Sequence, residues 1–160
     1  MIWKGGRSQL IVMERDQVAV RNGYTAFFYQ KALFKGLLPH YDETRYFQQD
    51  NACIYTCKLS EEWFQARNIS WIEWPAHSPD LNPIEYVWAA LKRNMKKMFP
   101  NIWEFKKNEL NIAEFTECLR KAWWAIDQGW IDKLIDTMPN RLRAVKKARG
   151  WYTKLLIWVT

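Results

Sequence analysis

The pattern of apolar and polar positions alternates between two periods over the first half of the chain. Short runs of β-branched, aromatic and other apolar residues occupy 1–3, 9–13, 45–49 and 69–74, with turn residues between them. Such runs predict strands. Apolar residues recur at helical spacing over 23–36 and 56–68, and Asn22 is the expected N-cap of the first of these helices. Alternating strands and helices over residues 1–98 predict an α/β sheet domain.

The second half has a helical pattern throughout. The proline-rich stretch WPAHSPDLNPIE runs into a helix with one apolar face, formed by Ile84, Val87, Trp88, Leu91, Met95 and Met98. Two further amphipathic stretches follow from about residue 110, the second interrupted near Met138 and Pro139. Because no repeat, low-complexity segment or linker interrupts the chain, we expect one domain over 1–160. Its sheet core would cover about 1–98 and its helical tail about 99–160.

Composition and charge narrow the function classes. The chain has 160 residues, a net charge of +7 and 49% apolar residues, with eleven Trp. A basic balance favours acidic partners, nucleic acid first, although a basic domain without such a partner has the same composition. Three cysteines do not resemble a disulfide framework, and the two His lie apart from them, which disfavours a zinc site. No apolar run approaches a membrane span and the N-terminus lacks a signal-peptide pattern, so we expect a soluble intracellular protein.

Two carboxylates have both a structural and a functional interpretation. Asp50 follows a predicted strand, where α/β sheets bind ligands, but an Asp there also starts turns. Glu85 is the third residue of a helix that begins with Asn82 as N-cap and Pro83 at the first position, as in a capping box. Glu85 also shares a stripe with Ala89, Lys92 and Lys96, which suits either a phosphate-bearing ligand or solvent.

The combination of the two motifs is more specific than either one. QQDNA ends the predicted strand at Asp50, and WPAHSPDLNPIEYVW carries Glu85 thirty-four intervening residues later. With FQQDNA, the LK at 91–92 and the C-terminal MPNRLRAVKKARGWYTK, these motifs resemble the catalytic domain of the mariner-type transposase superfamily, a class of DDE endonucleases. The resemblance covers nearly the whole chain.

The resemblance implies a ribonuclease-H-like fold, with a mixed sheet flanked by helices. It implies three carboxylates that hold two Mg²⁺ (or Mn²⁺) ions for DNA strand cleavage and transfer in the nucleus. One ion activates the attacking water or 3′-hydroxyl, and the other stabilises the leaving oxygen. By resemblance, Asp50 is the second carboxylate and Glu85 the third, so both are the expected catalytic residues and metal ligands.

The chain departs from the family pattern in three respects. The first strand of the sheet, with the first Asp, has no counterpart here, nor does the helix-turn-helix part. Cys53 and Tyr55 occupy positions where the family commonly has Pro and His. We therefore expect a rearranged sheet, an incomplete metal site and a domain that is inactive alone. A second copy or a full-length transposase would be the partner that supplies the missing Asp. The alternatives are a non-catalytic DNA-binding or interaction remnant, and an unrelated basic domain in which Glu85 only caps its helix.

Two basic clusters are the expected DNA contacts, because phosphate contacts need cations and no particular sequence. The residues are Lys92, Arg93, Lys96, Lys97, Arg141, Arg143, Lys146 and Lys147. Lys106, Lys107, Arg149 and Lys154 extend the same clusters. Solvated helix faces are the alternative interpretation. The run KRNMKK is also compatible with nuclear import.

Overall fold

The computed structural model describes residues 1–19, 23–76, 78–103, 112–151 and 153. These residues form two compact units. Unit 1 consists of Met1 and residues 11–77, and unit 2 of residues 2–10 together with 78–160. The expected single domain stays a prediction, and each unit is taken by itself below.

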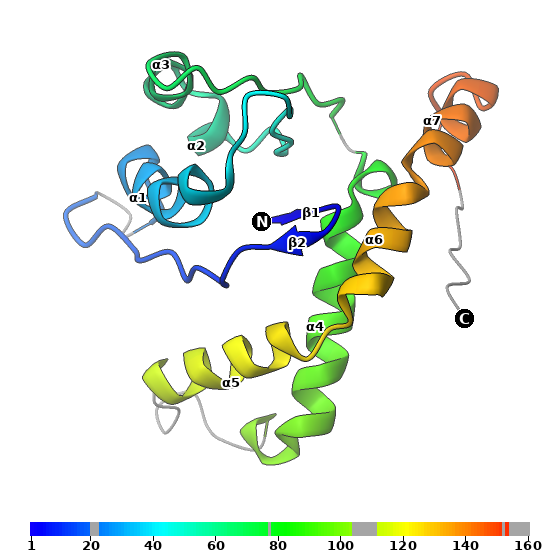
Figure 1. The fold of residues 1–160 in the computed structure, drawn as a ribbon. Coiled ribbons are helices and arrows are strands. Elements are labelled where there is room, and N and C mark those ends of the chain that lie inside the picture. The colour runs from blue at the N-terminus through cyan, green and yellow to red at the C-terminus, as the bar shows by residue number, and fades with distance from the viewer. Residues whose placement is uncertain (20–22, 77, 104–111, 152, 154–160) are drawn as a thin grey trace. The chain divides into compact units, whose positions relative to one another are not determined.

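Unit 1 is built from helices packed on an aromatic core (Figure 1). Its helices are α1 (Ala26–Gly36), the short α2 (Cys53–Thr56) and α3 (Lys58–Gln65), with a 3-10 turn, η1, at Leu38–His40. The predicted helix over 56–68 is therefore confirmed as α3. The predicted helix over 23–36 is confirmed with a later start, at Ala26, while its expected cap Asn22 lies outside the described residues. The core residues are Tyr29, Leu33, Leu37, Trp63, Phe64 and Ile69.

The predicted strands of unit 1 do not form a sheet in the described residues. Segments 45–49 and 69–74 meet at a single parallel bridge between Phe47 and Trp71. The Phe47 N–H donates to the Ser70 carbonyl at 2.8 Å, and the Ile72 N–H donates to the Phe47 carbonyl at 3.0 Å. Residues 9–13, predicted as a strand, have no strand structure. A strand exists only through its neighbours, and none pairs with residues 9–13 here, so this prediction is wrong.

Unit 2 begins with a small hairpin. Strand β1 (Ile2–Trp3) pairs antiparallel with β2 (Gly6–Arg7), in the register Ile2 to Arg7 and Trp3 to Gly6. Its turn requires a positive φ of 87° at Gly5, which glycine adopts without a Cβ clash. The hairpin is tied to the helices of the same unit, because the Gly5 N–H donates to Asp132 Oδ1 at 2.9 Å.

The remainder of unit 2 is helical, as the apolar periodicity predicts. Figure 1 shows α5 (Ile112–Trp124) and α6 (Gln128–Asp136) against the long α4 (Pro83–Met98), with α7 (Met138–Lys147) after α6. Two 3-10 turns, η2 (Pro79–Leu81) and η3 (Pro100–Trp103), precede and follow α4. The predicted interruption near Met138 is found at Thr137, between α6 and α7. The core includes Val87, Leu91, Met95, Trp123, Ile131 and Leu134.

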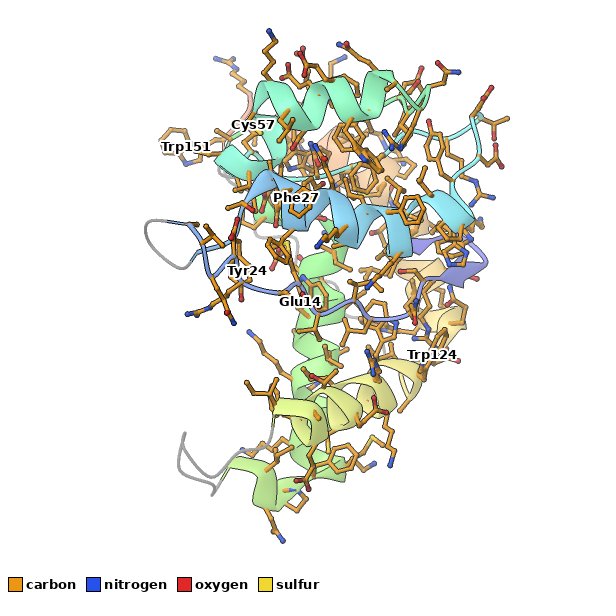
Figure 2. The ribbon with its side chains drawn as sticks, turned by 90° about the vertical axis from the view of Figure 1, so that its left-hand side faces the viewer. Glu14, Tyr24, Phe27, Cys57, Trp124 and Trp151 are labelled. Atoms are coloured by element: carbon orange, nitrogen blue, oxygen red, sulfur yellow. The ribbon has the colours of Figure 1, made fainter. Side chains whose placement is uncertain are left out.

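Arg7 closes the C-terminal end of α5. Its guanidinium donates to the carbonyls of Trp123, Trp124 and Ile126 at 3.0, 3.2 and 2.7 Å. A cation there satisfies carbonyls that have no partner inside the helix. Trp124, marked in Figure 2, is 54% exposed at the end of α5. None of the helices in the described part of the chain has the length and apolar character needed to cross a bilayer.

Candidate active site

Asp50 lies in unit 1, three residues after the bridge between Phe47 and Trp71. Its Oδ1 accepts a hydrogen bond from the Ala52 N–H at 3.1 Å, which makes the turn expected of an Asp at a strand end. Its Oδ2 accepts no hydrogen bond from the residues that the structure describes, and the side chain is exposed. The turn and a ligand would therefore use different oxygens, and the two interpretations of Asp50 are compatible.

The residues on either side of Asp50 anchor its backbone. The Asn51 amide donates to the Trp74 carbonyl at 2.6 Å. Gln49 accepts a short hydrogen bond from the Tyr29 hydroxyl and donates to the Tyr55 carbonyl at 3.2 Å. Asn51 was predicted only as a turn residue, because nothing in its immediate sequence indicates a partner twenty-three positions away.

Asp50 opens onto a cleft of about 370 Å³ within unit 1. Two further carboxylates and two indoles share its lining, which consists of Gln49, Asp50, Asn51, Tyr55, Thr56, Glu61, Trp71, Ile72, Glu73 and Trp74. The sequence gave no motif for Glu61 or Glu73, because neither lies in one of the matching stretches. Among the described residues, no three His, Cys, Asp or Glu side chains are grouped closely enough to hold a metal ion.

Two tyrosines respond to the charge of Asp50. Burial raises the pKa of Tyr55, and the negative charge of Asp50 raises it further. Burial also raises the pKa of Tyr29, with smaller contributions from Tyr55 and Asp50. Their rings are tilted against one another, with centroids 4.4 Å apart. Both phenols are neutral at physiological pH, so Tyr55 cannot exchange a proton there as a histidine would.

Glu85 lies in unit 2, in the first turn of α4. The side chain of Asn82 accepts a hydrogen bond from the Ile84 N–H at 3.3 Å, so the predicted N-cap is confirmed. The Asn82 N–H, however, donates to the Pro79 carbonyl at 3.0 Å. The capping box predicted for Glu85 is therefore wrong, because its backbone donor is already used by η2. Glu85 is exposed and makes no hydrogen bond or ion pair with the described residues.

The basic residues of unit 2 differ in their exposure. Those on α4 are exposed (Lys92, Arg93, Lys96, Lys97), as are three on α7 (Arg143, Lys146, Lys147). Arg141 is 0% exposed. Its guanidinium bonds to Thr137 and to the Asp80 carbonyl, and lies over the Tyr86 ring. A buried guanidinium cannot contact a phosphate, so the structure removes Arg141 from the predicted DNA contacts. Lys106, Lys107 and Lys154 lie outside the described residues.

Comparison with known proteins identifies the family. Residues 22–107 match the family described as DDE superfamily endonuclease. Over 108 residues the chain is 41% identical to the Tc1 transposase of Caenorhabditis elegans, an alignment covering 68% of this chain and 36% of that protein. It is 36% identical to the Tcb2 transposase of Caenorhabditis briggsae over 108 residues, with the same two coverages of 68% and 36%. The chain thus spans about a third of the length of these relatives.

A solved structure of the Mos1 transposase catalytic domain with raltegravir and manganese has a similar fold. The TM-score is 0.60 at 22% identity, over 82% of this chain and 66% of that one. The fold is thus that of a ribonuclease-H-like catalytic domain, although its mixed sheet is not found in the residues described here. The family match includes both Asp50 and Glu85. The chain therefore belongs to the DDE superfamily endonucleases, as a mariner-type transposase domain.

Proposed function

We propose that this domain carries two of the three carboxylates of a metal-dependent site for DNA strand cleavage and transfer. Asp50 and Glu85 are these carboxylates. The observation that supports the assignment most is that both lie within the family match, in the motifs QQDNA and SPDLNPIE. In addition, Asp50 Oδ2 and the Glu85 carboxylate are exposed and accept no hydrogen bond from the described residues. The named relatives, Tc1 and Tcb2, are transposases.

The donor chemistry of both residues fits Mg²⁺ or Mn²⁺. These ions prefer hard oxygen ligands, and Mg²⁺ often takes only one or two protein carboxylates and completes its coordination with water. Solved Mos1 catalytic domains contain Mn or Mg. When bound, such ions activate the attacking oxygen and stabilise the leaving oxygen. The contribution of this chain is to hold the carboxylates: Asn51 and Gln49 anchor the turn of Asp50, and Asn82 fixes the start of the helix that carries Glu85.

The carboxylate set of this chain is incomplete in our proposal. The first Asp implied by the family resemblance has no counterpart, and neither Glu14 nor Asp16 follows the strand that carries it in the family. The chain by itself therefore binds the ion weakly and does not cleave DNA. A second copy or a full-length transposase would supply the missing carboxylate, and the complex would act on DNA in the nucleus.

Manganese binding tests the site without requiring activity. We expect the electron paramagnetic resonance of free Mn²⁺ to show weak binding by the 160-residue chain. Asp50→Asn and Glu85→Gln should each weaken it, because each removes an anionic ligand. Glu114→Gln, an exposed change in the first turn of α5, is the matched control and should have no effect. Unchanged affinity in both site variants would exclude the proposed ligands.

A second candidate is a DNA-binding remnant without catalysis. The exposed cations of α4 and α7 favour it, because they are available to phosphates whether or not a metal is bound. Plasmid DNA incubated with the chain and Mg²⁺ or Mn²⁺ separates the two. Nicking that Asp50→Asn and Glu85→Gln both abolish would show that the chain is catalytic alone. Mn²⁺ and DNA binding without nicking would agree with an incomplete site, and DNA binding without Mn²⁺ binding would favour the remnant.

A further inference from the structure

Asp80, in the turn η2 before α4, is held by two residues from the C-terminal end of unit 2. Arg141 Nη1 donates to the Asp80 backbone carbonyl at 2.5 Å, across 61 positions of sequence. Thr153 donates twice to Asp80 Oδ2, from its N–H at 3.3 Å and from its hydroxyl at 2.8 Å. The backbone and the side chain of the same residue are therefore fixed from two different places.

Arg141 is itself firmly placed. Its Nε donates to Thr137 Oγ1 at 2.8 Å, and the Thr137 hydroxyl donates to the Leu134 carbonyl at 2.6 Å. Its Cζ lies 4.4 Å from the centre of the Tyr86 ring. Burying a guanidinium costs free energy, which an apolar residue of similar size would avoid. Packing alone thus does not explain an arginine here, whereas directed bonds from α7 to the turn before α4 do.

The held turn leads directly into the residue that matters for the proposed site. Turn η2 ends at Leu81, Asn82 is the N-cap of α4, and Glu85 is the third residue of that helix. Tyr86, under the Arg141 guanidinium, is the next residue. The contacts of Arg141 therefore reach both the turn before Glu85 and the residue after it. Because Glu85 makes no bond of its own to the described residues, its placement depends on how firmly this helical turn is held.

We propose that Arg141, Asp80 and Thr153 form a clamp that positions Glu85 for metal binding, an inference that rests on the proposed function of Glu85. The three are positioning residues and need not touch the ion. A ligand on a helix end that is already fixed loses less conformational freedom when it binds. The segment after α7 is in this view a working part of the site, which supports Glu85 from the far end of the sequence.

A double-mutant cycle on Mn²⁺ affinity tests the clamp. Thr153→Val removes the hydroxyl donor at nearly constant shape, and Arg141→Lys keeps the charge but loses the forked geometry. We expect each to weaken Mn²⁺ binding by about tenfold, as for other supports of metal ligands. In a Glu85→Gln background neither should cause a further loss, because the positioned group is gone. An equal loss in both backgrounds would overturn the proposal. Thr116→Val, a half-buried change in α5, is the control.

Hydrogen exchange of a peptide covering residues 79–87 gives a readout that needs no metal. Thr153→Val and Arg141→Lys should speed its exchange while a peptide from α5 stays unchanged. Equal exchange rates in wild type and variants would overturn the clamp. If Arg141→Lys does not fold, Asp80→Asn replaces it, since it keeps the backbone acceptor and weakens only the Thr153 contacts. If Glu85→Gln leaves Mn²⁺ affinity unchanged, the proposed function fails, and the exchange data alone then decide whether the clamp exists.

Discussion

Asp50 combines a local structural role with a free carboxylate oxygen. One oxygen makes the turn to Ala52, while the other is left for a ligand. Its charge is also sensed by the two buried tyrosines, whose pKa values rise mainly because burial disfavours the phenolate. A cation bound at Asp50 would offset that charge and would thus lower the pKa of Tyr55.

The raised pKa of Tyr29 predicts a loss of stability at alkaline pH. Because the pKa in the folded state lies above the unfolded value of about 10, the neutral phenol stabilises the fold fully below that pH. This stabilisation is lost as the pH rises above about 10. Tyr29→Phe, which cannot ionise, should lose less stability than wild type between neutral and strongly alkaline pH.

Urea unfolding followed by circular dichroism at a series of pH values measures this difference. The comparison is between slopes, because Tyr29→Phe also loses the hydrogen bond to Gln49 and starts from a lower stability. Tyr46→Phe, at a site that is 70% exposed, is the control and should keep the wild-type slope. A Tyr29→Phe slope equal to that of wild type would show that this phenol does not couple to folding.

At the level of the element, α4 shows how far local sequence determines structure. Its apolar face buries Val87, Leu91 and Met95, and its first turn starts at the predicted cap. The strand predictions succeed less well, since 45–49 and 69–74 share only one bridge and 9–13 share none. A helix satisfies its backbone within itself, whereas a strand needs a partner that no local pattern supplies.

The N-terminus of α4 predicts unequal effects for two neighbouring substitutions. Asn82→Ala removes the side-chain cap and should lower the free energy of unfolding by about 1 kcal/mol. Glu85→Gln should lower it by much less, since no capping box forms and only the interaction with the helix dipole is lost. Urea denaturation of both variants measures the two effects. A loss for Glu85→Gln as large as that for Asn82→Ala would contradict the bonding described here.

Considered as a whole molecule, the chain carries a net charge of +7 that is unevenly useful. The burial of Arg141 means that the amount of basic sequence overstates the basic surface of α7. The cations that remain exposed on α4 and α7 belong to the same unit, and no acidic residue occurs in α7. Their contribution to DNA affinity is a property of the surface, which salt dependence measures directly.

Salt titration of DNA binding tests that surface. Changing Lys92, Lys96, Arg143 and Lys147 together to Gln should make the slope of log affinity against log salt shallower. Each lost phosphate contact contributes about 0.9 to the slope. A matched variant changes four exposed cations of unit 1, Lys31, Lys35, Arg45 and Lys58, to Gln and should leave the slope close to wild type. Equal effects of the two variants would show that net charge, rather than this surface, determines binding.

The sequence by itself determined the helices of the second half and the identities of the two candidate carboxylates. Apolar periodicity and the Asn82 cap act within a few residues, so they can be read without a partner. The motifs around Asp50 and Glu85 likewise carry the family, because their residue types and spacing are visible in one dimension.

Only the tertiary structure decided which side chains are engaged. It buried Arg141 against a turn 61 positions away, used the Asn82 N–H for η2, and joined Asn51 to Trp74. It also left Glu85 without a bonding partner in the described residues. These outcomes depend on contacts between distant segments, whose partners are brought together by the burial of apolar surface elsewhere in the unit. A pattern of neighbouring residues does not contain that information.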